Sequence, residues 1–200
     1  MHNILATNFT LIPKMKDQIA RAVQVLRNGG LILYPTDTVW GIGCDATNAE
    51  AVDRIYKLKQ SVNKKSMIVL VGDVDSVGRY VNGAPAVAWD LLETATSPLT
   101  LILSGAANVA ENLVPDEGTL GVRVPDHEFC RQLLHRFGRP LVSTSANISG
   151  EPAPTDFDGI SEEIRAGVDL IVDPRFEGKP TRKPSSIIAI DQSGLFKIIR

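Results

Sequence analysis

The chain alternates between short apolar runs and segments with helical spacing. Short, mostly apolar runs are typical of buried strands, and they fall at 31–34, 67–71, 99–103, 120–124, 141–142, 170–172, 186–190 and 196–199. Apolar residues recur on one helical face over 14–28, 48–59, 86–94 and 126–137, with weaker helical patterns over 75–81 and 157–165. This alternation predicts one α/β domain over residues 1–200, with a twisted, mostly buried mixed sheet flanked by helices.

Local signals mark where several of these elements begin and end. Asn48 is a suitable N-cap for the second helix, and Asn28-Gly29-Gly30 is a typical stop for the first. Pro35 ends the first strand because proline has no N–H for the ladder. Asp126, directly after Pro125, is expected to cap the helix over 126–137.

The stretch Tyr34-Pro-Thr-Asp-Thr-Val-Trp-Gly-Ile-Gly43 carries the first candidate chemistry. Two threonine hydroxyls and the Asp37 carboxylate follow a strand directly, and Gly41 and Gly43 allow close backbone approach in what is expected to be a loop. A polar loop held by a rigid strand is a common place for a small ligand. An ordinary turn capped by Asp and Thr side chains explains the same spacing.

Three further polar clusters lie near predicted strand ends, where open α/β sheets bind ligands. They are the basic run Arg54, Lys57, Lys59, Lys64 and Lys65; Arg123 within an apolar strand; and Ser143-Thr144-Ser145-Ala146-Asn147. The basic run also fits a solvated helix face, and the serine cluster also fits a turn or helix cap. Arg123 must be paired, exposed at an edge or bound to a ligand, since an unpaired buried charge is costly.

Composition narrows the class of protein. With 200 residues, 44% hydrophobic and 22% charged, the chain is typical of a globular protein, and its net charge of -2 means that nucleic acid would need a local basic patch. Cys44 and Cys130 form neither a metal spacing nor a disulfide framework, which favours a reduced, cytoplasmic setting. No apolar run reaches the roughly 18 residues of a membrane span. We see no nucleophile–base pair, no dinucleotide or Walker-type glycine loop and no protein metal site.

Taken together, these clusters resemble the YrdC/TsaC-like family, the threonylcarbamoyl-AMP synthases, over about residues 11–200. The stretch 34–43 looks like the family's opening signature, with Trp40 where tyrosine is usual. The later motifs follow in order: Lys57-Leu-Lys59 with Met67-Ile-Val-Leu70, Ser97-Pro-Leu-Thr100, Gly121-Val-Arg-Val-Pro125, Ser143 to Gly150, and Lys183-Pro-Ser-Ser-Ile-Ile188. The family usually has Lys-x-Arg, whereas this chain has Ser61 at the arginine position, with Lys64 and Lys65 nearby.

The resemblance implies a large concave substrate cleft and a reaction of L-threonine, bicarbonate and ATP that gives threonylcarbamoyl-AMP and pyrophosphate. By family position, threonine is held by Thr38, Arg123, Ser143 and a serine of the pair Ser185 and Ser186. ATP is held by Lys59, Ser61, Lys65, Thr119, Ser145, Asn147 and Arg200, with Lys59 and Arg123 as the catalytic cations. Mg²⁺ is expected on the ATP phosphates rather than in a protein cage.

The product implied by the resemblance feeds threonylcarbamoyladenosine modification of tRNA, so tRNA-modifying proteins are the expected downstream partners. Two alternatives stay open at this point. A YciO-like paralogue shares the scaffold, and Ser61 is the departure that favours it. A module that binds double-stranded RNA or tRNA would use the same lysines through shape and phosphate contacts.

Overall fold

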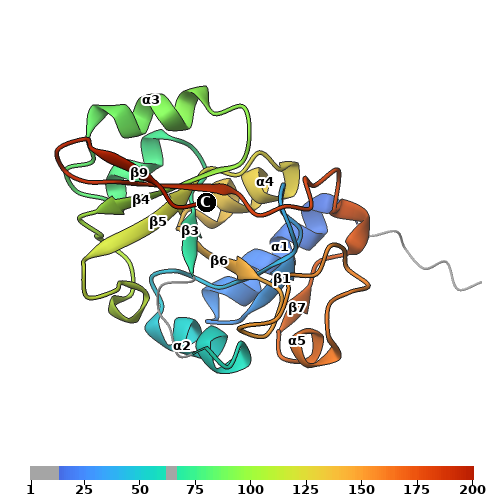
Figure 1. The fold of residues 1–200 in the computed structure, drawn as a ribbon. Helices are drawn as coiled ribbons and strands as arrows, with labels where there is room; N and C mark the ends of the chain where they lie inside the picture. The colour runs from blue at the N-terminus through green and yellow to red at the C-terminus, as the bar shows by residue number, and fades with distance from the viewer. Residues whose placement is uncertain (1–13, 62–66) are drawn as a thin grey trace, which may run out of the picture.

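The computed structural model describes residues 14–61 and 67–200, and its strands form one mixed sheet (Figure 1). The order across the nine-stranded sheet is β7-β1-β2-β6-β3-β5-β4-β8-β9. The pairs β1/β7, β3/β5 and β4/β8 are parallel, and the other neighbours are antiparallel. The strands are β1 (Ile32–Tyr34), β2 (Gly41–Gly43), β3 (Ile68–Leu70), β4 (Leu99–Ser104), β5 (Thr119–Arg123), β6 (Leu141–Ser145), β7 (Leu170–Ile171), β8 (Ser186–Ile190) and β9 (Phe196–Ile198).

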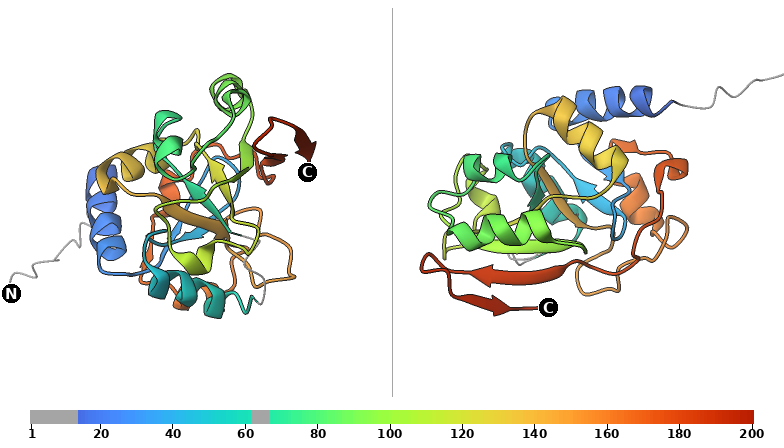
Figure 2. Two further views of the ribbon diagram at one scale, coloured as in Figure 1. Left: turned by 90° about the vertical axis from the view of Figure 1, so that its left-hand side faces the viewer. Right: turned by 90° about the horizontal axis from the view of Figure 1, so that it is seen from above.

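Helices pack on both faces of this sheet (Figure 2). They are α1 (Met15–Arg27), α2 (Ala49–Leu58), α3 (Ala86–Thr94), α4 (Glu128–Phe137) and α5 (Glu162–Ala166), with the 3₁₀ helices η2 (Asp75–Arg79), η3 (Glu111–Leu113) and η4 (Pro174–Phe176). The Asn48 side chain accepts a hydrogen bond from the backbone N–H of Ala51, which confirms the predicted N-cap of α2. The predicted fold class, a mixed sheet flanked by helices, is confirmed.

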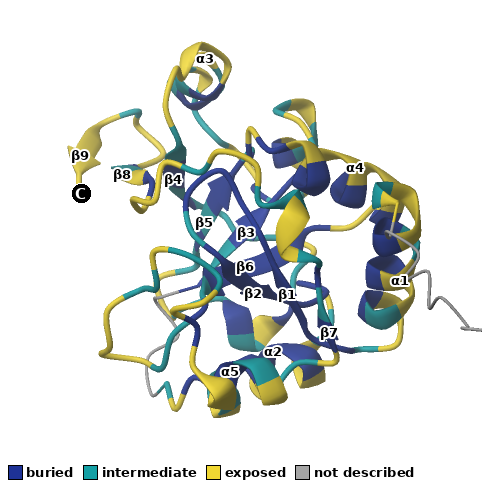
Figure 3. Cartoon of the chain, turned by 90° about the vertical axis from the view of Figure 1, so that its right-hand side faces the viewer, coloured by how far each residue is buried: buried dark blue, intermediate teal, exposed yellow. Residues whose placement is uncertain are grey.

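The apolar core divides into two clusters, one on each face of the sheet. Helices α1 and α4 pack together over Ile32, Tyr34, Leu70 and Leu141. The larger cluster joins α2, α3 and α5 to the opposite face, through residues such as Leu33 and Val122. Figure 3 shows the buried strands at the centre, with α1 and α4 on one side and α2 and α5 on another. Both cysteines are buried and free, as expected for core residues.

Several element boundaries differ from the sequence-based predictions. Gly41–Gly43 was expected in a loop but forms β2, because it pairs with β1 and with β6. The serine cluster was expected after a short strand, yet β6 runs to Ser145, since its partners β2 and β3 continue alongside it. Helix α4 begins at Glu128 and makes no side-chain cap, so Asp126 is not its N-cap.

The weak helical pattern over 157–165 is realised only near its end. Helix α5 begins at Glu162, and the Ser161 side chain caps it by accepting from the N–H of Ile164. Within the described residues, no helix has both the length and the apolar character needed to cross a membrane.

Candidate functional site

A cavity of about 720 Å³ lies on one face of the sheet. Its floor consists of side chains that alternate along neighbouring strands, because every second residue of a strand points to the same face. The floor positions are Gly41 on β2, Ile68 on β3, Thr100 and Ile102 on β4, Thr119, Gly121 and Arg123 on β5, Ser143 and Ser145 on β6, and Ile187 on β8. This is the face that α1 and α4 cover elsewhere, so the cavity occupies the part of the sheet beside them.

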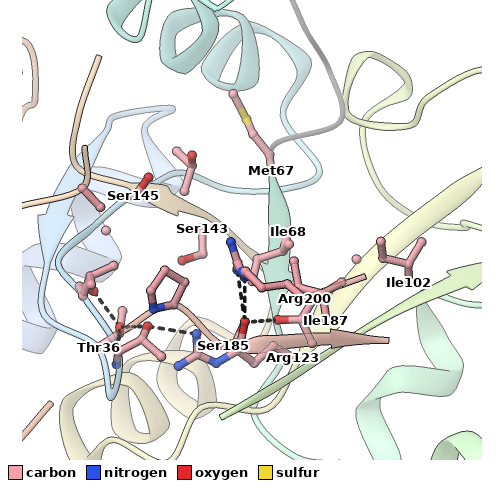
Figure 4. Close-up of a pocket in the computed structure, with 18 of the residues that line it drawn as sticks. Thr36, Met67, Ile68, Ile102, Arg123, Ser143, Ser145, Ser185, Ile187 and Arg200 are labelled. Atoms are coloured by element: carbon pink, nitrogen blue, oxygen red, sulfur yellow. Dashed lines mark hydrogen bonds between the residues drawn. The ribbon is translucent and has the colours of Figure 1, made fainter. Parts of the chain in front are cut away.

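The walls of the cavity come from segments that are far apart in the sequence. Thr36 and Thr38 come from the loop after β1, Pro115 and Glu117 from the segment after η3, and Asn147 from the segment after β6. Pro184, Ser185 and Arg200 close another side. Figure 4 shows Arg123, Ser143, Ser145, Ser185 and Arg200 arranged around this one space.

Arg123 is the central buried cation of the site. Its guanidinium forms an ion pair with the Asp37 carboxylate and donates a hydrogen bond of 3.0 Å to Thr38 Oγ1. The second Asp37 oxygen accepts from the N–H of Asp126 at 3.2 Å. Of the three outcomes open to Arg123 from the sequence, the structure therefore shows pairing, and the partner is the first polar loop itself. Arg123 Nε is buried and has no hydrogen-bond partner in the described part of the chain.

Lys59 lies behind the cavity wall. Its ammonium donates to the backbone carbonyls of Ser145 and Asn147, at 2.6 Å each, and Lys59 is not among the residues that line the cavity. Burial lowers the pKa of Lys59 to about 8, because the charged form is poorly solvated. Lys59 thus holds in place the two residues, Ser145 and Asn147, that do line the cavity.

The C-terminal segment completes the site through Ser185 and Arg200. Ser185 is buried, and its hydroxyl lies 2.7 Å from the Thr100 hydroxyl on β4. Arg200 donates through Nε and an Nη to the Ser185 carbonyl at 3.2 and 3.1 Å, which places its guanidinium at the cavity (Figure 4). Hydroxyls and guanidinium groups are suited to carboxylate and phosphate oxygens.

The structure brings together most of the residues expected in the site. Thr38, Thr119, Arg123, Ser143, Ser145, Asn147, Ser185 and Arg200 all line the cavity. Ser61 is half-buried and Ser186 is exposed, and neither is a cavity-lining residue. Lys64 and Lys65 lie outside the described residues. The hypothesis that the polar clusters converge on one concave site is therefore confirmed for all clusters except the basic run. From that run, Lys59 contacts the backbone of the cavity wall without lining the cavity itself.

Sequence reasoning did not single out Gly121, Glu117 and Glu151 as cavity residues. The alternation Thr119, Gly121, Arg123 was visible in the sequence and places all three side-chain positions on one face. Nothing comparable marks Glu117 and Glu151, because loop residues have no fixed period. Neither buried cysteine is among the residues that line the cavity, and burial raises the pKa of both thiols.

Comparison with known proteins places this arrangement in a family. A family model described as telomere recombination, which covers the Sua5, YciO and YrdC proteins, matches residues 24–200. The chain belongs to the Sua5/YciO/YrdC family. Among curated Sua5/YciO/YrdC relatives, the threonylcarbamoyl-AMP synthase of Chromohalobacter salexigens is 41% identical over 68% of this chain and 74% of its own length. The enzyme of the same name from Pseudoalteromonas translucida is 33% identical over 86% of this chain and 94% of its own length.

Solved structures of this family share the fold. The structure of P. abyssi Sua5 complexed with L-threonine has a TM-score of 0.84 and 27% identity, and it covers 94% of this chain. The match spans 54% of that Sua5 chain, or about half its length. The structure of E. coli YciO has a TM-score of 0.81 and 28% identity, and the match covers 94% of this chain and 90% of that one.

Proposed function

We propose that this protein is an enzyme that makes threonylcarbamoyl-AMP and pyrophosphate from L-threonine, bicarbonate and ATP, which makes it a nucleotidyltransferase. The observation that carries the proposal is the convergence on one cavity of the residues that the resemblance assigns to threonine and to ATP. The name shared by the curated relatives and the L-threonine complex of P. abyssi Sua5 support the same conclusion.

In this proposal the amino acid lies near the loop after β1. Arg123, held by Asp37, faces the threonine carboxylate, with Thr38 and Ser143 beside it. Of the pair Ser185 and Ser186, the proposal takes Ser185, because it is buried at the cavity while Ser186 is exposed. Thr119, Ser145, Asn147 and Arg200 are then left for ATP, with Ser61 and Lys65 as further predicted ATP residues.

The substrates supply the nucleophile for this reaction. The unprotonated threonine amine combines with bicarbonate to give a carbamate and water. A carbamate oxygen then forms a bond to the α-phosphorus of ATP, the bond from that phosphorus to the bridging oxygen breaks, and pyrophosphate leaves with the electron pair. The protein has to orient the reactants and stabilise the growing charge on pyrophosphate, which fits fixed guanidinium and hydroxyl donors without a catalytic triad.

In this proposal, Mg²⁺ binds together with ATP, on the phosphate oxygens. Among the described residues, no group of three or more His, Cys, Asp or Glu side chains could hold a metal ion. The cavity wall does contain Glu117 and Glu151, and Mg²⁺ bound to nucleotides commonly takes one or two carboxylates in addition to phosphate oxygens. The donor set therefore suits a phosphate-bound Mg²⁺ better than a resident metal.

The proposal is tested by measuring pyrophosphate release from ATP, with L-threonine and bicarbonate each omitted in turn. We expect release only when all three substrates are present. Lys59→Ala should lower this release about 100-fold, because the Ser145 and Asn147 carbonyls lose their buried cation. Release that does not depend on threonine would reject the proposed reaction.

A YciO-like role is the second candidate, and two observations favour it. Ser61 stands where the family usually has arginine, and the YciO match covers 90% of that chain. Ser61→Arg should then create or raise threonine-dependent turnover. Binding of duplex RNA without any pyrophosphate release would instead favour an RNA-binding module. Downstream tRNA-modifying partners and a cytoplasmic location stay predictions.

A further inference from the structure

The Tyr34 side chain extends over β2, along one face of the sheet, to reach Ser143. Tyr34 is on β1 and Ser143 is on β6, and β2 lies between these two strands. The Tyr34 hydroxyl donates to Ser143 Oγ at 2.9 Å. Tyr34 is fully buried among the residues under α1 and α4, whereas Ser143 lines the cavity. The pair therefore links the closed core to the cavity.

The glycine at position 43 of β2 makes this crossing possible. A Cβ atom at Gly43 would lie 2.8 Å from Tyr34 Cε1, and one at Gly41 would lie 3.5 Å from the same atom. The aromatic ring thus occupies the space that a side chain would fill at Gly43, and it lies at van der Waals distance from the side-chain position of Gly41. Gly41-Ile-Gly43 is neither a phosphate-binding loop nor a turn in this structure, because it is a paired strand under an aromatic ring.

This contact fixes the direction of two protons. In the described part of the chain, Ser143 Oγ is the one hydrogen-bond partner of the Tyr34 hydroxyl. Burial raises the pKa of Tyr34, so the phenol keeps its proton. Because that proton points at Ser143 Oγ, the serine oxygen acts as an acceptor on the core side. Its own O–H is then free to donate into the cavity, and a carboxylate can only accept.

We propose that Tyr34 is a positioning residue that makes Ser143 a hydrogen-bond donor toward the carboxylate of the amino-acid substrate. This inference rests on the proposed function, in which Ser143 and Arg123 share that carboxylate. Figure 4 shows both residues at the same cavity. Without the phenol proton, the Ser143 hydroxyl can rotate and donate elsewhere, so part of the bound population presents lone pairs to the carboxylate.

The test is Tyr34→Phe, which keeps the ring over Gly41 and Gly43 and removes only the hydroxyl. The α-carboxylate forms and breaks no bond in the proposed reaction and keeps its charge throughout, so its contacts should contribute about equally before and during the reaction. We therefore expect the KM for L-threonine to rise about threefold to tenfold while kcat and the KM for ATP change less than twofold. Equilibrium binding of L-threonine, measured by calorimetry, should weaken by the same factor.

A double-mutant cycle separates positioning through Ser143 from a general loss of packing. Ser143→Ala should raise the threonine KM at least as much as Tyr34→Phe does, and the double variant should match Ser143→Ala alone. Tyr56→Phe is the matched control, because the Tyr56 hydroxyl donates to the Asn112 carbonyl and Tyr56 does not line the cavity. We expect it to leave the threonine KM unchanged.

The outcomes distinguish a failure of the positioning role of Tyr34 from a failure of the proposed function. If the wild-type protein binds threonine and releases pyrophosphate but Tyr34→Phe leaves the threonine KM unchanged, the positioning role is wrong and the proposed function stands. Additive losses in the double variant also overturn the positioning role. If the wild-type protein neither binds threonine nor releases pyrophosphate, the proposed function itself fails. If Tyr34→Phe proves unstable, Ser143→Ala alone still tests the positioning role: an unchanged threonine affinity in that variant would mean that Ser143 donates nothing to the carboxylate, and the role would be wrong.

Discussion

At the scale of single residues, the ion pair between Asp37 and Arg123 determines how the cavity presents its positive charge. Both side chains are largely buried, with 11% and 5% exposed, so each charge depends on the other for solvation. The carboxylate also accepts from the N–H of Asp126, which fixes its orientation. Arg123 is therefore held as a rigid donor rather than as a mobile surface cation.

Asp37→Asn tests this dependence. Replacing the carboxylate leaves the Arg123 charge buried without its counterion, so we expect the free energy of unfolding to fall by about 3 kcal/mol. Threonine affinity should fall at least tenfold, because the guanidinium loses its fixed orientation. Urea denaturation and threonine titration measure the two effects. The control is Asp126→Asn, which removes an exposed partner of Arg131 and should cost at most about 1 kcal/mol. Equal losses in the two variants would contradict the role given to the buried pair.

At the scale of secondary-structure elements, Lys59 joins the end of α2 to the end of β6. It is the C-cap residue of α2, and its ammonium donates to the Ser145 and Asn147 carbonyls. The pKa of Lys59 falls from 10.5 to about 8 on folding because of burial. Between these two pKa values the unfolded chain binds more protons than the folded one. The stability that depends on Lys59 is therefore present above pH 10.5 and is lost as pH falls through about 8.

We expect this linkage to appear in the difference between the wild-type protein and Lys59→Met. As pH rises from 8 to 10.5, the free energy of unfolding of the wild type should increase relative to the variant, by about 2–3 kcal/mol. Urea denaturation across this pH range measures the difference. Lys57→Met, at an exposed position of the same helix, keeps Lys59 and should keep the wild-type slope. Parallel pH curves for wild type and Lys59→Met would show that burial does not shift this ammonium.

The strand face that forms the floor of the cavity depends on a small residue at its centre. A Cβ at Gly121 would lie 2.8 Å from Ile68 Cγ2, the methyl on the branched Cβ of a side chain that also lines the cavity. Gly121→Ala should therefore push Ile68 toward the bound ligands, and we expect the KM for ATP or threonine to rise about tenfold. Gly72→Ala is the control, because its Cβ would meet nothing closer than 3.7 Å. Unchanged kinetics in Gly121→Ala would mean that the substrates do not reach the floor near β5.

The elements also show what the sequence could and could not predict. Long periodic segments such as 14–28 and 48–59 were located well, because one apolar face recurs over several turns. The strand β2 was missed, since one of its two partners, β6, lies far away along the chain. The same reason hid the contacts that define the site: Arg123 was recognised as needing a partner, but its pairing with Asp37 spans 86 positions. Sequence patterns thus identified the polar residues of the site. Only the tertiary structure shows that Lys59 contacts backbone carbonyls and that Ser143 lines the cavity.

At the scale of the whole molecule, the cavity exists only when distant segments meet. Its lining extends from Thr36 to Arg200 and uses strands β2, β3, β4, β5, β6 and β8. A ligand that binds this cavity binds the folded state and has no comparable site in the unfolded chain. Ligand binding must then raise the stability of the entire fold by mass action.

Thermal unfolding with ligands tests the identity of the amino-acid site at this scale. At 100 times its dissociation constant a ligand adds about 2.7 kcal/mol, which for a chain of 200 residues corresponds to a Tm increase of about 5–10 °C. We expect L-threonine with a non-hydrolysable ATP analogue to give such an increase. L-serine lacks one methyl group, which is worth only about 1–3 kcal/mol in a binding pocket, so at equal concentration its shift should be smaller but measurable. Arg123→Gln is the control, because the carboxylate contact is lost for both amino acids and both shifts should shrink together. Equal Tm shifts for serine and threonine in the wild-type protein would show that the cavity does not distinguish the threonine methyl group. The amino-acid subsite beside Arg123 and Ser143 would then have to be reassigned.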